Sequence, residues 1–309
     1  MNRVIDISVD GRHLSLFRGF LVISEQHNEI ARVALDDIGA IIVHAHGVTY
    51  TNSLLVELAN RGVIVVLCAA NHFPIAYIMA VEGNHTQSGR MADQIGASLP
   101  LQKQLWRQIV IHKIRMQAST LSAFGIACDR LNMLARDVKS GDPSNIEAQA
   151  ARHYWPLLLG SDFRRDRSAE DANALLNYGY TVLRAAVTRS IVATGLIPSL
   201  GIHHKSQVNA FALADDDLIE PFRPLVDVTV RRLVTNGHTT VSPETKRALA
   251  ALLDFDVNLG TTRSPVKTAI ATLCNSLVTS YANRKAKLIF LNPPDPISLS
   301  ALGVVDDHS

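Results

Sequence analysis

Hydrophobic and polar positions alternate over short runs in the first eighty residues, a pattern typical of half-buried strands. The Asp10-Gly11 pair between the first two runs predicts a hairpin turn. A short amphipathic helix is expected over Ser53–Arg61, where Gly62 ends it. The strands expected from the pattern are Arg3–Val9, His13–Phe17, Leu21–Ser24, Ile30–Leu35, Ile41–His44, Val63–Cys68 and Phe73–Ala80.

The apolar stretch Gly62–Val81 raises the question of a membrane span. Asn71, His72 and Pro74 interrupt it in the middle. A span needs about 20 consecutive apolar residues. The stretch therefore predicts two short buried segments, and no membrane partner is expected.

From about Leu99 the apolar positions recur every three or four residues, which predicts helices. Ser242-Pro243 and Ser264-Pro265 each place a proline in the first turn of a helix, where it is favoured. The glycine-rich and polar Val81–Gly96 region predicts a linker. The expected helices are Leu101–Val138, Glu147–Leu159, Ala169–Gly195, Asp216–Val234, Pro243–Leu253 and Pro265–Lys287.

These patterns together predict an α+β fold, with a small N-terminal β-sheet domain followed by a larger all-helical domain. The expected boundaries are residues 1–82 for the β-rich domain, 83–98 for a linker, 99–292 for the helical domain and 293–309 for an extended tail. If two copies of the chain associate, the apolar β domain is the surface expected to join them. Fold class alone does not select a function.

Composition narrows the function classes. The 309 residues are 47% hydrophobic and 19% charged, with a formal net charge of +2, so a nucleic-acid-binding surface would have to be a local patch. Cys68, Cys128 and Cys274 have no CxxC spacing, which argues against a zinc knuckle and a secreted disulfide scaffold. Asp6 and Asp10 interrupt the start of the chain, so no export signal is expected and a cytoplasmic protein is predicted.

Glu147 is the first candidate for chemistry. Ser144-Asn145-Ile146-Glu147 fits a capping box, in which Glu147 would serve only the helix start. Glu147 also shares one helical face with Ala151 and Tyr154. A carboxylate on a packed face needs a partner, and a metal ion is one such partner.

A second candidate is the segment that begins at His203-His204 and continues to Arg223. At most one of the adjacent histidines is expected to bind a metal. The acids Asp215–Asp217 and Glu220 could simply complement a helix dipole. However, Asp217 and Glu220 lie three apart on one face, where two carboxylates repel each other unless a cation relieves them. Oxygen-rich sites of this kind suit Mg²⁺ or Mn²⁺.

Basic side chains gather at several places and are candidates for DNA contacts, although each could be a solvated helix face. Arg223 could pair with an acid or hold a phosphate. Neither a glycine-rich phosphate loop nor a GxSxG motif occurs. The DNA-binding candidates are Lys103, Arg107, Arg164, Arg165, Arg223, Arg284 and Lys285.

Three stretches together resemble a known family. They are Glu147–Trp155 (EAQAARHYW), Asn173–Tyr180 (NALLNYGY) and His203–Asp227, and Leu54–Leu67 is also similar. The chain resembles the CRISPR-associated integrase of spacer acquisition, in the type II branch, over essentially its whole length.

The resemblance implies a metal-dependent DNA endonuclease and integrase that inserts foreign DNA into a CRISPR array. Carried over, the metal ligands and catalytic residues are Glu147, His204 and Glu220, with Mg²⁺ or Mn²⁺ as the cofactor. Compared with the usual spacing in the family, the segment between the second histidine and Glu220 has one extra residue, which falls among Asp215–Asp217. This leaves His203 and His204 open as alternatives and makes Asp217 an auxiliary candidate.

The resemblance also implies partners. These are double-stranded and branched DNA, a second copy of the chain, a small second adaptation subunit that bridges two dimers, and the effector nuclease of the same system. Two other functions stay open. A non-catalytic DNA-binding scaffold would use the acids only as helix caps, and a small-molecule hydrolase would use a mononuclear metal. The absence of an HExxH pair weighs against the hydrolase.

Overall fold

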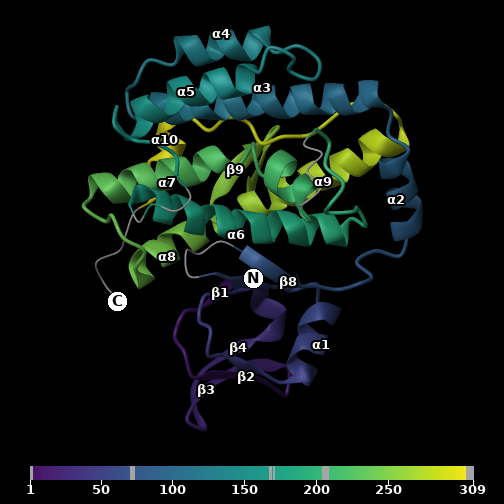
Figure 1. The fold of residues 1–309 in the computed structure, drawn as a ribbon, viewed down its shortest axis with the longest axis vertical. Helices are drawn as coiled ribbons and strands as arrows, with labels where there is room; N and C mark the ends of the chain where they lie inside the picture. Colours follow the sequence, from purple (N-terminus) through teal and green to yellow (C-terminus); the bar gives the residue numbers. More distant parts are fainter. Residues whose placement is uncertain (1–2, 70–73, 167–168, 170, 204–208, 304–309) are drawn as a thin grey trace. The chain divides into compact units, whose positions relative to one another are not determined.

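The structure is a computed structural model that describes residues 3–69, 74–166, 169, 171–203 and 209–303. The chain divides into two compact units, residues 1–85 and residues 86–309. Strands dominate the first unit and helices dominate the second (Figure 1). The predicted α+β fold class is therefore confirmed.

Two four-stranded sheets form the N-terminal unit. In the first, three strands run parallel and the fourth is antiparallel, and its order is β1 (Arg3–Ile7), β5 (Ile38–Val43), β7 (Ile64–Cys68) and β8 (Pro74–Ile78). Every residue of β5 is buried, as expected for an inner strand of a parallel sheet. The second sheet has the order β4 (Asn28–Ala34), β3 (Phe20–Glu25), β2 (Arg12–Phe17) and β6 (Thr49–Tyr50).

The predicted hairpin between the first two strands is wrong, because β1 and β2 belong to different sheets. Gly11 does turn the chain, with a φ of +78°. The turn is held by Gly47, however, whose N–H donates to Asp10 Oδ1 at 2.7 Å and whose carbonyl accepts from Gly11 N. Strand β1 pairs with β5, more than thirty residues away.

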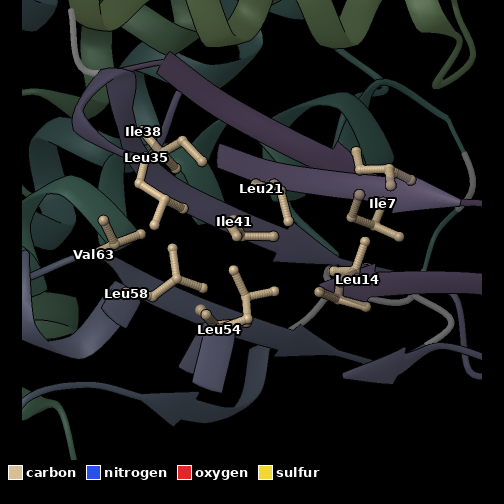
Figure 2. Packing of buried hydrophobic residues seen from close by; sticks show 12 residues of the cluster. Ile7, Leu14, Leu21, Leu35, Ile38, Ile41, Leu54, Leu58 and Val63 are labelled. Atoms are coloured by element: carbon tan, nitrogen blue, oxygen red, sulfur yellow. The ribbon is translucent and has the colours of Figure 1, made fainter. Parts of the chain in front are cut away.

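Side chains from both sheets and from helix α1 (Asn52–Asn60) share one core. Figure 2 shows Ile41 of β5 among Leu14 and Leu21 of the second sheet and Leu54 and Leu58 of α1. All five side chains are at most 1% exposed. The helix begins where Thr51 accepts the Leu54 N–H. Burial of this apolar surface holds the unit together.

Helices build most of the C-terminal unit, and α6 contacts α7, α8 and α9. The long helix predicted over Leu101–Val138 is two helices, because Gly125 turns the chain with a φ of +69°. Figure 1 shows the first of them, α3, beside α4 and α5. The bounds are α2 Gln87–Ile95, α3 Leu99–Ala123, α4 Asp129–Asp137, α5 Ile146–Leu159, α6 Ala172–Ala193, α7 Arg223–Thr235, α8 Pro243–Ala251, α9 Val266–Ala282 and α10 Pro296–Leu299.

The C-terminal unit is mostly helical, and the expectation of an all-helical domain needs one correction. Strands β9 (Asp256–Leu259) and β10 (Thr262–Pro265) form an antiparallel hairpin before α9. Their alternating residues flank Gly260, whose φ is +63°, so the turn signal is present in the sequence.

Two segments expected to be irregular carry structure. Residues 83–98 were expected to be a linker, and they include α2. Residues 293–309 were expected to be an extended tail, and within the described part Leu299 and Leu302 are buried. Arg232 of α7 donates to the Ser300 carbonyl at 2.7 Å. No described helix combines the length and the apolar character needed to cross a membrane.

Candidate active site

Helix α5 places Glu147 in its first turn, but the Glu147 carboxylate does not cap the helix. The N-cap is Asn145, not Ser144, and its φ of +50° lies in the left-handed region. Asp142 accepts the N–H groups of the first two residues of the helix, including Glu147 at 3.0 Å. The capping-box interpretation of Ser144 and Glu147 is therefore wrong, and the Glu147 side chain is directed to another helix.

Glu220 lies in an interruption of the helix predicted over Asp216–Val234. A π-helical segment, η2 (Leu213–Leu218), comes first, a turn follows, and α7 begins only at Arg223. The acids therefore do not lie in the first turn of a regular helix as dipole partners. Glu220 is only 4% exposed, so its charge needs partners inside the protein. Single π-helical turns are frequent at functional sites.

Lys113 of α3 brings Glu147 and Glu220 together. Its Nζ lies 2.5 Å from Glu147 Oε1 and also forms an ion pair with Glu220 Oε2. Burial acts to lower the pKa of Lys113, but the charges of Glu220 and Glu147 outweigh it and hold the pKa above its ordinary value. Two carboxylates that are 73 residues apart in the sequence thus share one cation; we call them the carboxylate pair.

Arg223 is a second cation at the carboxylate pair. Its Nη1 lies 3.2 Å from Glu220 Oε1, and its Nη2 donates to the Asp215 carbonyl at 2.9 Å. The guanidinium lies over the Tyr180 ring, 5.0 Å from the centroid. Arg223 was expected to bind an acid or a phosphate, and in this structure it binds Glu220.

The loop that leads to His203 is held from two sides. Buried Gln94 of α2 donates to the carbonyls of Ile197 and Leu200 at 3.1 and 2.9 Å, and accepts the Ile197 N–H at 2.8 Å. Asp217, also buried, accepts the Ile202 N–H at 2.6 Å. Sequence reasoning missed Gln94, because it assigned this helix to a linker.

The histidines are only partly described. The exposed His203 ring stacks on Trp106 of α3, with centroids 4.6 Å apart and an interplanar angle of 2°. His204, the expected ligand, lies outside the described residues. Asp217, the auxiliary candidate, directs one carboxylate oxygen to the loop backbone.

Asp227 anchors a buried network beside the site. Its carboxylate accepts hydrogen bonds from Tyr154 at 2.9 Å and Tyr180 at 2.5 Å. Burial raises the pKa of Asp227 to about 7, although the two tyrosine hydrogen bonds act in the opposite direction. Arg165 donates to the side chains of Asn173 and Asn177 and lies over the Tyr180 ring. The Asn173–Tyr180 stretch thus supplies hydrogen-bond partners to Arg165 and Asp227.

The other DNA-binding candidates lie on the surface at separate places. Arg107 lines a pocket of about 610 Å³ together with Arg136 and Lys139, and donates to the Val138 carbonyl at 2.8 Å. Arg164 is exposed and donates to nearby backbone carbonyls. Exposed positions are also held by Lys103 on α3 and by Arg284 and Lys285 after α9.

The donor chemistry of the carboxylate pair fits a hard divalent cation. Among the described residues no group of three or more His, Cys, Asp or Glu is placed to hold a metal ion. Two of the three expected ligands nevertheless converge on one ammonium, which shows that their oxygens accept a cation at this place. Carboxylate oxygens are the ligands that Mg²⁺ and Mn²⁺ prefer.

Comparisons with known proteins agree with this architecture. The family of CRISPR associated protein Cas1 matches residues 6–256. The CRISPR-associated endonuclease Cas1 of Neisseria meningitidis is 38% identical over 287 residues, covering 91% of this chain and 93% of the relative. A Pyrobaculum aerophilum endonuclease of the same name is 29% identical, covering 79% of this chain and 86% of the relative.

Solved structures show the same fold. A casposase bound to integration product superposes with a TM-score of 0.78 at 19% identity, covering 99% of this chain and 96% of the other. A Cas1 protein from Thermotoga maritima gives 0.75 at 16% identity, with coverage of 92% and 98%. A strand-rich unit followed by a mostly helical unit is thus the fold that this chain shares with a Cas1 protein of known structure. The chain belongs to the Cas1 family, so the expected family is confirmed.

Proposed function

We propose that this protein is a metal-dependent DNA endonuclease and integrase that inserts DNA fragments into a CRISPR array. The single observation that carries the proposal is the convergence of Glu147 and Glu220 on one cation inside the helical unit. The family membership supports it, because the curated relatives are CRISPR-associated endonucleases and one structural neighbour is a casposase with its integration product.

Glu147, His204 and Glu220 would hold Mg²⁺ or Mn²⁺. When bound, such an ion lowers the pKa of an attacking hydroxyl and neutralises charge that develops on a phosphate. Asp142 and Asn145 hold the start of α5, which fixes the position of Glu147. Arg223 holds Glu220 through Oε1.

The reaction exchanges one phosphodiester for another. The 3′-oxygen of the incoming fragment forms a bond to phosphorus, and the bond from phosphorus to the 3′-oxygen of the array strand breaks. The proton lost by the nucleophile is balanced by the proton gained by the leaving oxygen. With water as the nucleophile, the same exchange is hydrolysis. Positioning and electrostatic stabilisation suffice, so no covalent enzyme intermediate is needed.

The partners follow from the same relatives. A Cas6-RT-Cas1–Cas2 complex contains a chain with this fold, at a TM-score of 0.75 over 94% of this protein and 36% of that chain. We propose that this protein also acts with a small second subunit, and that two copies of it form a dimer through the N-terminal unit. DNA contacts are then expected mainly at the backbone, through Lys103, Arg107, Arg164, Arg165, Arg284 and Lys285.

A nicking assay tests the proposal. Branched DNA is incubated with the purified protein, with and without Mn²⁺, and the Glu147→Ala and Glu220→Ala variants are run in parallel. Metal-dependent nicking that both variants lose supports the proposal. DNA binding without nicking at any metal concentration would instead support the non-catalytic scaffold. Equal nicking by the Glu220→Ala variant would contradict the ligand assignment.

A further inference from the structure

The carboxylate pair faces two positive charges that belong to the protein itself. Lys113 contacts both carboxylates, and Arg223 contacts the other oxygen of Glu220. Among the described residues, these two carboxylates and two cations balance each other in charge. All four are mostly shielded from water, since the side-chain exposures are 12% for Lys113, 26% for Arg223, 20% for Glu147 and 6% for Glu220.

A divalent ion cannot join this set without a large change in charge. Its entry would leave a net charge of two beside buried groups, where like charges repel strongly because the local dielectric constant is low. Binding is far more favourable if one resident cation leaves as the ion arrives.

The contacts identify which cation can leave. Arg223 is held independently of the pair, by the Asp215 carbonyl at 2.9 Å and by the Tyr180 ring at 5.0 Å. Lys113 ends in a compact ammonium on a flexible four-carbon stem. The Lys113 ammonium is held by the pair itself, through Glu147 Oε1 and Glu220 Oε2.

We propose that Lys113 is the resident counter-cation of the carboxylate pair, and that the divalent ion and the Lys113 ammonium occupy the pair in turn. This inference rests on the proposed function, because it concerns the same metal. Lys113 then has two effects. It keeps Glu147 and Glu220 together in the metal-free protein, and it weakens the apparent affinity for the metal.

The effect of Lys113 on the apparent metal affinity can be expressed as a change in Kd. When only a fraction of the protein has an accessible site, the apparent Kd is the intrinsic Kd divided by that fraction. If Lys113 closes the pair in nine-tenths of the molecules, its removal tightens Mn²⁺ binding about tenfold. The same removal leaves the buried Glu220 and the half-buried Glu147 carboxylates opposed in the metal-free protein, which lowers its stability.

Two readouts test this on the full-length protein without any nuclease assay. Mn²⁺ binding is measured by electron paramagnetic resonance of the free ion, and unfolding is followed by circular dichroism with and without Mn²⁺. The variants are Lys113→Met and Lys113→Gln, of which the second keeps a polar group if the first folds poorly. Lys139→Met removes one exposed lysine of the same unit and is the matched control.

The Lys113 variants are expected to bind Mn²⁺ about tenfold more tightly than the wild type. They should also melt at a lower temperature without metal and gain more from Mn²⁺ than the wild type, whereas Lys139→Met should behave as the wild type. Unchanged or weaker binding by both Lys113 variants would overturn the inference. If the wild type binds no Mn²⁺ in a Glu147-dependent manner, the proposed function itself fails.

Discussion

Gln94 offers a direct test of how the histidine loop is held. Its side chain is 2% exposed and makes three hydrogen bonds to the backbone of Ile197 and Leu200. The Gln94→Met substitution keeps the volume of the side chain and removes all three bonds. A hydrogen bond contributes a net ~1 kcal/mol on average, so the expected loss is ~3 kcal/mol.

The loss should be visible in thermal unfolding of the full-length protein. In a unit of roughly 150–250 residues, each kcal/mol shifts Tm by about 2–4 °C, so the variant should melt roughly 6–12 °C below the wild type. Gln104→Met changes an exposed glutamine of α3 and should leave Tm unchanged. A Gln94→Met protein that melts within about 1 °C of the wild type would refute this account of the loop.

Three further predictions concern single residues of the helical unit. Burial raises the pKa of Asp227 to about 7, above its ordinary value, so the folded state becomes less stable as the pH rises from about 4 to about 7. The Asp227→Asn variant should therefore gain stability relative to the wild type over that window, as measured by urea titrations at several pH values. Parallel curves of stability against pH for the two proteins would contradict the assignment. A Cβ at Gly179 would lie 2.5 Å from a methyl group of Val226, so Gly179→Ala should destabilise the protein by about 1–3 kcal/mol. Chemical denaturation measures this loss, and an unchanged midpoint would count against the close packing of α6 on α7. If Arg107 contacts one DNA phosphate, Arg107→Ala should reduce the slope of log Kd against log salt concentration by about 0.9. The control is Arg130→Ala, which changes another exposed arginine and should leave the slope unchanged. Equal slopes for Arg107→Ala and the wild type would show that Arg107 does not contact DNA.

The order of elements could be predicted from the sequence because hydrophobic periodicity is local. A period of two in the first eighty residues and a period near 3.6 afterwards separate the strand-rich unit from the helical one. Strand pairing could not be predicted in this way. Asp10-Gly11 signals a turn correctly, but β1 pairs with β5. This pairing depends on the burial of apolar segments that are far apart in the chain.

The site shows the same division. Glu147 and Glu220 were found through patterns and a family resemblance, and the structure places them together. Lys113 was not among the candidate residues, since nothing in its neighbourhood along the chain indicates two acidic partners on other elements. Gln94 was hidden for a similar reason: its partners, about a hundred residues away, are backbone groups that leave no signal in the sequence.

The central claim, attack by a 3′-hydroxyl at the carboxylate pair, is tested most directly by an integration assay. The purified protein and its small second subunit are incubated with Mn²⁺, a supercoiled plasmid that carries the array, and a labelled DNA fragment. The account predicts joining of the label to the array for a fragment with 3′-hydroxyl ends, and none for a fragment with 3′-dideoxy ends or with the Glu220→Ala protein. Joining of the 3′-dideoxy fragment, or normal joining by Glu220→Ala, would contradict it.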